Sequence, residues 1–214
     1  MNLLIVGAGG LGRELFSWLS QEIKNKPEHK IIGFLDDNLS GLDNYSYTVK
    51  IVSTIKDYQP KEDEQLVLAI MEPKIKKQVV RALISKGANF YTFIHSTAII
   101  GHNVKIGSGC IIDPHCVLYC DITVGDFVFI STSSVIGHDI DIGSYTSINI
   151  NSTIAGNNKI GSCCMLGVGA KTIPHREIGD NCIIGAGSVI TKNIPSNAVA
   201  FGVPAAIQRS QQNY

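Results

Sequence analysis

The sequence predicts two architectures in one chain: a Rossmann-like α/β domain over residues 1–93 and a parallel β-helix over residues 94–214. Two observations predict this division. In the first part, apolar strand-like segments alternate with amphipathic helix-like segments, as in parallel α/β sheets. From residue 94 onward, aliphatic residues recur every six positions, which is the repeat of a β-helix.

The α/β part begins with the strand-like segment LLIVGAG, which ends in glycines. The next segment, LGRELFSWLSQEI, places Leu11, Leu15, Trp18 and Leu19 on one helical face. Three more strand-like segments and a helix that ends at Gly87 follow: KIIGFLDDN, VKIVST, QLVLAIM and PKIKKQVVRALISKG. This alternation predicts a small parallel sheet of about four strands.

The second part repeats without interruption from Ile94 to Ile190, where sixteen of seventeen sixth residues are aliphatic and Thr172 is the exception. Glycine follows nine of these positions: Gly101, Gly107, Gly125, Gly137, Gly143, Gly161, Gly167, Gly179 and Gly185. Three hexads close one triangular coil, so we expect about five to six coils with aliphatic residues stacked inside and glycine at the corners.

Composition excludes some classes of partner. Lysine plus arginine and aspartate plus glutamate number 18 each, so the net charge is zero, and we expect neither nucleic acid nor membrane as a partner. The start MNLLIVGAGG has no basic segment before its apolar residues and is interpreted as a strand, which predicts a cytoplasmic protein.

Four of the six cysteines share the small interior position of the repeat and are predicted to be free thiols: Cys110, Cys116, Cys164 and Cys182.

The stretch IGHDIDIG interrupts the repeat with His138 followed by Asp139. Residues 18 apart stack, so His138 is expected above Cys120 and His102, with Gly156 on its other side. His102 and His138 lie two coils apart, about 10 Å, so we expect no metal site. Asp139 could orient the imidazole of His138 as a general base. From the residues alone, a catalytic His138 and a merely solvated one both remain open.

The glycine pattern GAGGLG, residues 7–12, follows a strand and precedes a helix, as in dinucleotide-binding folds. A complete NAD site uses two mononucleotide halves, and this α/β part is too short for both. We therefore expect one nucleotide, with its diphosphate at the helix N-terminus and its ribose or base near Asp36 or Asp37.

Six motifs together resemble the bacterial sugar acyltransferases related to sialic acid O-acetyltransferases and nucleotide-aminosugar N-acetyltransferases. The resemblance extends from residue 2 to about residue 207 and rests on GAGGLGRE, FLDD, SSVIGHD, AGNNKIG, LGVGA and GAGSVITKNIPSNAVAFGVPA. It implies a left-handed β-helix, a homotrimer with active sites between subunits, and acetyl-CoA as cosubstrate without a metal.

The resemblance also assigns roles to residues. It implies that His138 is the catalytic base and that Asp139 is its acidic neighbour. The residues implied for the nucleotide-linked sugar are Gly9, Gly10, Leu11, Asp36, Asp37, Met71 and Ser131. Those implied for acetyl-CoA are Ser147, Gly156, Val168 and Ala186. Three of these depart from the family pattern: Ser131 replaces an asparagine, Ser147 a second histidine, and Met71 a glycine.

The function implied is acetyl transfer from acetyl-CoA to the C4 amine of a nucleotide-linked 4-amino-4,6-dideoxyhexose. Two alternatives remain open. The same fold could acetylate a sugar hydroxyl, because both reactions would use His138 as base. A β-helix could also serve as a non-catalytic scaffold that binds ligands or partners.

Overall fold

The computed structural model describes residues 1–25 and 28–210, which form two compact units. The first unit contains Met1–Met71 and Ile75–Thr92, and the second contains Glu72–Lys74 and the chain from Phe93 onward. No helix in these described ranges is long and apolar enough to cross a membrane.

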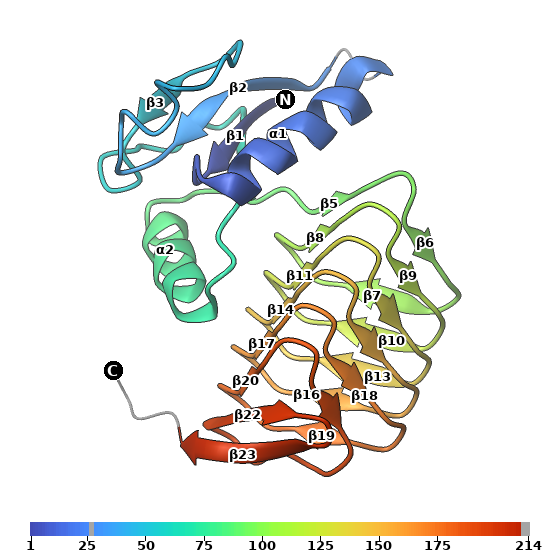
Figure 1. Ribbon diagram of the computed structural model, residues 1–214. Helices are drawn as coiled ribbons and strands as arrows, with labels where there is room; N and C mark the ends of the chain where they lie inside the picture. The colour runs from blue at the N-terminus through green and yellow to red at the C-terminus, as the bar shows by residue number, and fades with distance from the viewer. Residues whose placement is uncertain (26–27, 211–214) are drawn as a thin grey trace. The chain divides into compact units, whose positions relative to one another are not determined.

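The first unit is a four-stranded parallel sheet with the strand order β3-β2-β1-β4 (Figure 1). Its core is built from the apolar strand residues and from one face of each helix; Leu15 and Leu19 of the first helix are buried. Its elements are β1 (Asn2–Val6), α1 (Gly10–Glu22), η1 (Ile23–Asn25), β2 (Lys30–Leu35), β3 (Ile51–Ser53), β4 (Glu64–Leu68) and α2 (Pro73–Ser85).

The strand order reverses at β1, whose neighbours are β2 on one side and β4 on the other. Val6 at the end of β1 pairs with Leu68 at the end of β4. The glycine turn after β1 and the segment after β4 therefore leave the same edge of the sheet. Ligands of open parallel sheets bind at such a reversal, beyond the carboxyl ends of the strands.

The second unit is a left-handed parallel β-helix made of three sheets, as the six-residue repeat and the resemblance predict (Figure 1). Sheet I contains β5 (Phe93–Ile94), β8 (Ile111–Ile112), β11 (Phe129–Ile130), β14 (Ser147–Ile148), β17 (Met165–Leu166), β20 (Ile183–Ile184), β22 (Ala198–Gly202) and β23 (Ala205–Ser210). Sheet II contains β6 (Ile99–Ile100), β9 (Val117–Leu118), β12 (Val135–Ile136), β15 (Thr153–Ile154), β18 (Lys171–Thr172) and β21 (Val189–Ile190). Sheet III contains β7 (Val104–Ile106), β10 (Ile122–Val124), β13 (Ile140–Ile142), β16 (Lys159–Ile160) and β19 (Glu177–Ile178).

The interior of the β-helix is a set of aliphatic columns, because residues 18 apart pair across neighbouring coils. All six cysteines are free, as predicted for the four interior ones, which are fully buried. Their thiols lie close to backbone carbonyls of the next coil, as in the 3.0 Å contact from Cys110 Sγ to the Gly125 oxygen. Cysteine therefore serves here as a small interior residue.

The C-terminal end differs from the regular repeat. The last coil is shorter, since Ile178 pairs with Ile194 and Ile183 with Val199, both at a spacing of 16 residues. The chain then leaves the helical path and forms an antiparallel hairpin, β22–β23, on the edge of sheet I. The hexad pattern did not predict this hairpin, because β22 pairs with β20 at a spacing of 16 residues instead of 18, and β23 pairs antiparallel with β22.

Candidate active site

The corner between sheets II and III, here called the II–III corner, carries His138. In each coil, one residue of this corner has a left-handed backbone conformation, with φ between 54° and 60°: Asn103, Asp121, Asp139, Asn157 and His175. Asparagine and aspartate tolerate this conformation better than most residues. The tight corner therefore selects an aspartate or asparagine beside the position of His138.

His138 and Asp139 form a close pair at this corner. The distance from His138 Nδ1 to Asp139 Oδ2 is 2.6 Å, and both side chains are more than half exposed. With Nδ1 protonated toward the carboxylate, Nε2 carries the free lone pair. Nε2 has no hydrogen-bond partner within the described residues, so it can accept a proton from a ligand.

Gly156 lies one coil beyond His138, as the 18-residue spacing predicts. The Asn157 N–H donates to the His138 carbonyl at 2.9 Å, which fixes the stacking of the two coils. A Cβ atom added to Gly156 would lie only 2.5 Å from His138 Nε2. The imidazole therefore rests against bare backbone, and any larger residue at position 156 would displace it.

On the other side, Cys120 lies one coil before His138, and the Asp139 N–H donates to its carbonyl at 3.2 Å. Partial burial and a hydrogen bond to the Asp121 carboxylate raise the pKa of the Cys120 thiol above its ordinary value. The thiol therefore stays protonated near neutral pH and is a poor nucleophile. In the described part of the chain, no group of three or more His, Cys, Asp or Glu side chains could hold a metal ion.

Two interior residues near this corner were missed by the sequence analysis. Asn158 and Thr172 are buried among aliphatic columns, and both bind the backbone of Ala155 or Gly156. The signal in the sequence was the break in the repeat, because Thr172 is the one non-aliphatic residue in its series.

The predicted acetyl-CoA residues are divided between two corners. Gly156 lies beside His138, whereas Val168 and Ala186 are exposed at the corner between sheets I and II, the I–II corner. Ile150 stands one coil before Val168 and extends this exposed apolar column, which the sequence analysis missed. Sheet II separates the two corners, so one chain does not bring these residues together.

Ser131 and Ser147 are both buried. The Ser131 hydroxyl donates to the buried carboxylate of Asp113 at 3.1 Å, and Ser147 lies within β14 with no exposed surface. Both hydroxyls are therefore buried, whereas the side chain of His138 is exposed at the II–III corner.

In the first unit, the four glycines of the GAGGLG segment have different structural roles. Gly7 adopts a φ of +103°, and a Cβ at Gly12 would lie 1.9 Å from the Gly7 carbonyl, so both are required by the turn and by close packing. Gly9 and Gly10 are exposed and have open space beside them. Together with Leu11, they begin α1, which has no side-chain cap and no acidic residue in its first turn. Among the described residues, the N–H groups of Gly10 and Leu11 have no acceptor, so they can bind an anion.

The carboxylates after β2 are partly used by the fold. Both oxygens of Asp36 accept backbone N–H groups, from Ala8 at 2.7 Å and from Asn38 at 2.8 Å. Asp36 therefore ties the end of β2 to the glycine turn. Asp37 is exposed and, within residues 1–25 and 28–210, accepts only the Ile55 N–H, at 2.9 Å, so it has more capacity for a ligand than Asp36.

Two further residues of the first unit lie near the turn. Met71 is half-buried and follows β4 at the same sheet edge. Arg13, which the sequence analysis did not consider, returns to the Gly9 carbonyl and lies 3.8 Å from the centre of the Tyr45 ring. A guanidinium in the first turn of α1 adds positive charge where the helix dipole is already positive.

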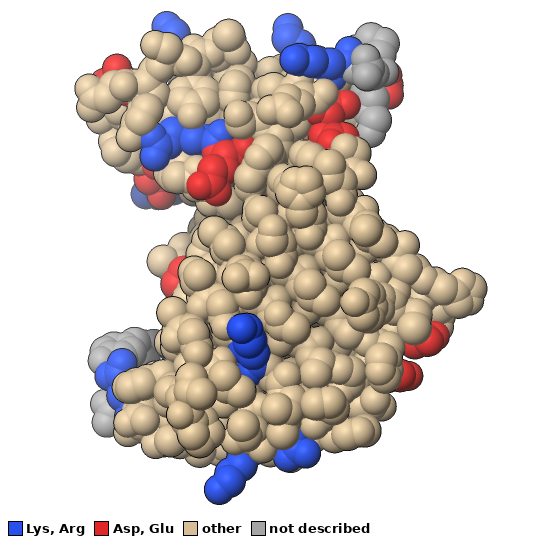
Figure 2. Space-filling model, turned by 45° about the vertical axis from the view of Figure 1, so that its right-hand side comes forward, with Lys and Arg blue, Asp and Glu red and all other residues tan. Residues whose placement is uncertain are grey.

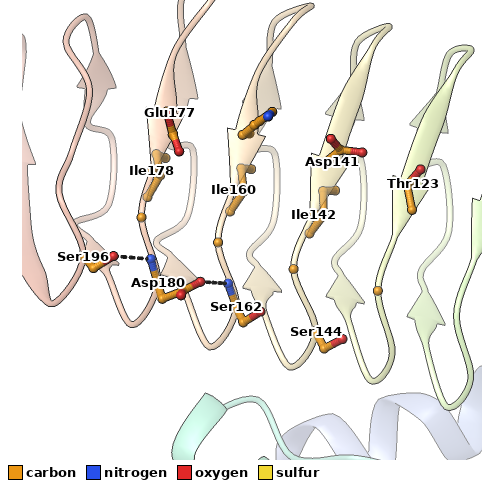
Figure 3. Close-up of a pocket in the computed structure, with 15 residues that line it drawn as sticks. Thr123, Asp141, Ile142, Ser144, Ile160, Ser162, Glu177, Ile178, Asp180 and Ser196 are labelled. Carbon is orange, nitrogen blue, oxygen red and sulfur yellow. Dashed lines mark hydrogen bonds between the residues drawn. The ribbon is translucent and has the colours of Figure 1, made fainter.

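A separate shallow groove of about 540 Å³ runs along sheet III and the corner between sheets III and I, the III–I corner (Figure 3). In Figure 3, Thr123, Asp141 and Glu177 project from three strands of sheet III, β10, β13 and β19, and Ser144, Ser162 and Asp180 follow at the corner. The corner residues bind the backbone of the neighbouring coil: Asp180 Oδ1 accepts the Ser162 N–H at 2.7 Å, and Ser196 Oγ accepts the Asp180 N–H at 2.9 Å. These groups are used to join coils.

Comparisons with known protein families match two separate parts of the chain. The PglD N-terminal domain family matches residues 2–83, and the bacterial transferase hexapeptide family, described as six repeats, matches residues 159–192. No curated protein matches the chain.

Several solved structures resemble nearly the whole chain. The acetyltransferase domain of PglB from Neisseria gonorrhoeae FA1090 shares the fold at a TM-score of 0.85 and 24% identity, over 96% of this chain and 98% of that one. PerB from Caulobacter crescentus, crystallised with CoA and GDP-perosamine, is 25% identical with a TM-score of 0.83, over 98% of both chains. WeeI from Acinetobacter baumannii AYE is 25% identical with a TM-score of 0.79, over 97% and 100%.

Proposed function

We propose that this chain, whose residues 2–83 match the PglD N-terminal domain family and whose residues 159–192 match the bacterial transferase hexapeptide family, acetylates the C4 amine of a nucleotide-linked 4-amino-4,6-dideoxyhexose. Acetyl-CoA is the proposed acyl donor. The observation that carries the proposal is the exposed His138–Asp139 pair, whose free Nε2 faces the bare Gly156 backbone. PerB, which resembles this chain over almost its full length, was crystallised with CoA and a nucleotide-linked amino sugar.

In the proposed mechanism, His138 acts as the general base. The neutral amine of the acceptor attacks the thioester carbonyl, a C–N bond forms, and His138 Nε2 takes the proton that leaves the nitrogen. Asp139 stabilises the resulting imidazolium through the 2.6 Å contact with Nδ1. The C–S bond then breaks, and the imidazolium returns the proton to the CoA thiolate.

The Gly156 N–H is the proposed donor to the thioester oxygen as negative charge develops on it. No covalent enzyme intermediate is needed, and the protonated Cys120 thiol next to His138 is unsuited to form one. Much of the rate would come from holding two cosubstrates in the correct relative position.

The nucleotide of the acceptor is proposed to bind at the edge of the first unit. The diphosphate would meet the free N–H groups at Gly9, Gly10 and Leu11. Asp37 would accept a hydrogen bond from the ribose or the base, with Met71 beside the nucleotide. Asp36 would act by shaping the glycine turn through its bond to Ala8.

A homotrimer is part of the proposal. Gly156 and Val168 lie at different corners of one chain, so a cosubstrate that contacts both needs two copies. The outward residues of sheet II are mostly aliphatic, and Figure 2 shows a face of the second unit with few charged side chains. These outward residues are Ile99, Val117, Val135, Thr153, Lys171 and Val189. Such a face is stabilised when a second copy covers it.

The proposal is tested by a thiol-release assay with acetyl-CoA. The acceptors are UDP-, dTDP- and GDP-linked 4-amino-4,6-dideoxyhexoses, each beside its 4-hydroxy counterpart. Rapid release with one amine only is expected. Release with a hydroxy sugar alone would replace the proposal with O-acetylation by the same fold. No release with any acceptor would contradict it and favour a β-helix that only binds ligands.

A further inference from the structure

A buried polar pair fixes the backbone beside His138. Asn158 is 1% exposed and Thr172 is 7% exposed, and both replace aliphatic residues of the interior. Ile122 and Ile140 occupy the position of Asn158 in the two preceding coils. A polar side chain in such an interior is costly unless its hydrogen bonds are satisfied.

The side-chain amide of Asn158 forms hydrogen bonds with backbone groups of this corner. Its Nδ2 lies 2.6 Å from the Ala155 carbonyl, 3.2 Å from the Gly156 carbonyl and 3.1 Å from the Ile173 carbonyl. Its Oδ1 accepts the Arg176 N–H at 3.2 Å. The side chain therefore binds both peptide groups that flank Gly156.

The side chain of Thr172 takes the place of a backbone carbonyl as the acceptor of a hydrogen bond between coils. Its Oγ1 accepts the Ala155 N–H at 3.0 Å. One coil earlier, the equivalent N–H of Gly137 donates to a backbone carbonyl, that of Ile154, at 2.8 Å. Ala155 is thus held on its N–H side by Thr172 and on its carbonyl side by Asn158.

These contacts determine where the Gly156 N–H points. The peptide group that joins Ala155 to Gly156 is planar and trans, so its carbonyl and its N–H point in opposite directions. Asn158 holds the carbonyl toward the interior, which turns the N–H to the outer side of the corner. That N–H has no acceptor within the described residues, and His138 Nε2 lies next to the Gly156 Cα.

We propose that Asn158 and Thr172 are positioning residues that aim the Gly156 N–H at the thioester oxygen. The inference rests on the proposed function, in which this N–H stabilises the developing oxyanion. Asn158 and Thr172 touch neither substrate, and their effect passes through the Ala155–Gly156 peptide. Such an oxyanion donor contributes mainly in the transition state.

The first test compares Asn158→Leu and Thr172→Val with Thr146→Val. Thr146 is a matched control, because its buried hydroxyl also binds backbone of the next coil, at Gly161 and Cys164, but at the III–I corner. We expect kcat to fall about 10- to 100-fold in Asn158→Leu and less in Thr172→Val, with KM for both substrates nearly unchanged. Thr146→Val should lose stability and keep its kcat. An unchanged kcat in folded Asn158→Leu, or an equal loss in Thr146→Val, overturns the inference.

The second test does not depend on the acceptor. Calorimetry compares the binding of CoA with that of a ketone analogue of acetyl-CoA in which methylene replaces the thioester sulfur. The wild-type chain should prefer the ketone by about fivefold, as one net hydrogen bond provides, and Asn158→Leu should lose that preference. If the wild-type chain transfers acetyl to no acceptor, but prefers the ketone while Asn158→Leu does not, the proposed acceptor is wrong and the positioning stands. An equal preference in both proteins overturns the positioning.

Discussion

The II–III corner and the III–I corner of the β-helix are built from the same hexad but use their polar residues differently. At the III–I corner, Asp180 and Ser196 accept N–H groups from adjacent coils, so these side chains are occupied by the fold (Figure 3). At the II–III corner, the side chain of His138 binds Asp139 and, among the described residues, leaves Nε2 without a partner. A polar corner residue is thus a candidate for chemistry when the coil-to-coil ladder does not use it.

In the interior, buried polar side chains bind backbone at both corners. Asn158 and Thr172 are buried polar residues at the corner where the surface carries the free histidine. At the III–I corner, the interior positions hold Cys110, Val128, Thr146, Cys164 and Cys182. Interior hydrogen bonds therefore hold the backbone at both corners, through Thr146 at the III–I corner and through Asn158 and Thr172 at the II–III corner, where the surface group His138 stays available.

The largest effect is expected from His138→Ala. Loss of the general base should lower kcat by about 10²- to 10⁴-fold in the thiol-release assay. His102→Ala is the matched control, because His102 occupies the same corner position two coils earlier beside Asn103. The kcat of His102→Ala should remain within about twofold of the wild type, because His102 transfers no proton in the proposed mechanism. Equal losses in the two variants would remove the distinction between His138 and an ordinary corner histidine.

A smaller loss is expected from Asp139→Asn. Asparagine suits the left-handed backbone at this position, as Asn103 and Asn157 do in their coils. The imidazolium would lose its stabilising carboxylate, so kcat should fall about 10- to 100-fold with an unchanged melting temperature. Asp121→Asn, at the same position one coil earlier, serves as control. A kcat that is the same in Asp139→Asn as in the wild type would exclude the carboxylate from catalysis.

At the III–I corner, Asp180→Ala should lower the stability of the fold and leave kcat unchanged. The substitution removes the acceptor of the Ser162 N–H, a charge-assisted bond at 2.7 Å. The free energy of unfolding should fall by about 1–2 kcal/mol, measured by urea denaturation. A reduced kcat without a reduced stability would show that the groove of Figure 3 takes part in the reaction.

The smallest effect concerns Cys120, which lies beside His138 but is not proposed to react. Because its thiol pKa is raised, little thiolate is present at pH 7, and the alkylation rate should still be increasing above pH 9. Asp121→Asn removes one cause of this shift and should speed alkylation at pH 8 a few-fold, as followed by peptide mass spectrometry. Rapid alkylation of the wild-type thiol at pH 7 would contradict a protonated Cys120.

Much of the fold was predictable because the hexad is a strictly local signal. The aliphatic series predicts the position of each coil, and the 18-residue spacing predicts that Gly156 lies against His138, as it does in the structure. The C-terminal hairpin was not predictable in this way, since β22 and β23 pair antiparallel outside the repeat. The shortened last coil was missed for the same reason.

The site was predictable only where residue type and spacing alone determine the geometry. The His138–Asp139 contact follows from adjacent residues at a tight corner. The binding of Asp36 to Ala8, in contrast, depends on how the end of β2 approaches the glycine turn, which no local pattern encodes. Thr172 was visible as a break in the repeat, but its role needed the partner Ala155, which lies 17 residues earlier.

The most direct measurement is a crystal structure of the chain with bound acetyl-CoA. The predicted result places the thioester oxygen about 3 Å from the Gly156 nitrogen, with the reacting carbonyl next to His138 Nε2. The pantetheine arm should contact Val168 and Ala186 of a neighbouring copy. A thioester in the groove of sheet III, or at any corner distant from His138, would contradict the assignment of the active site to the II–III corner.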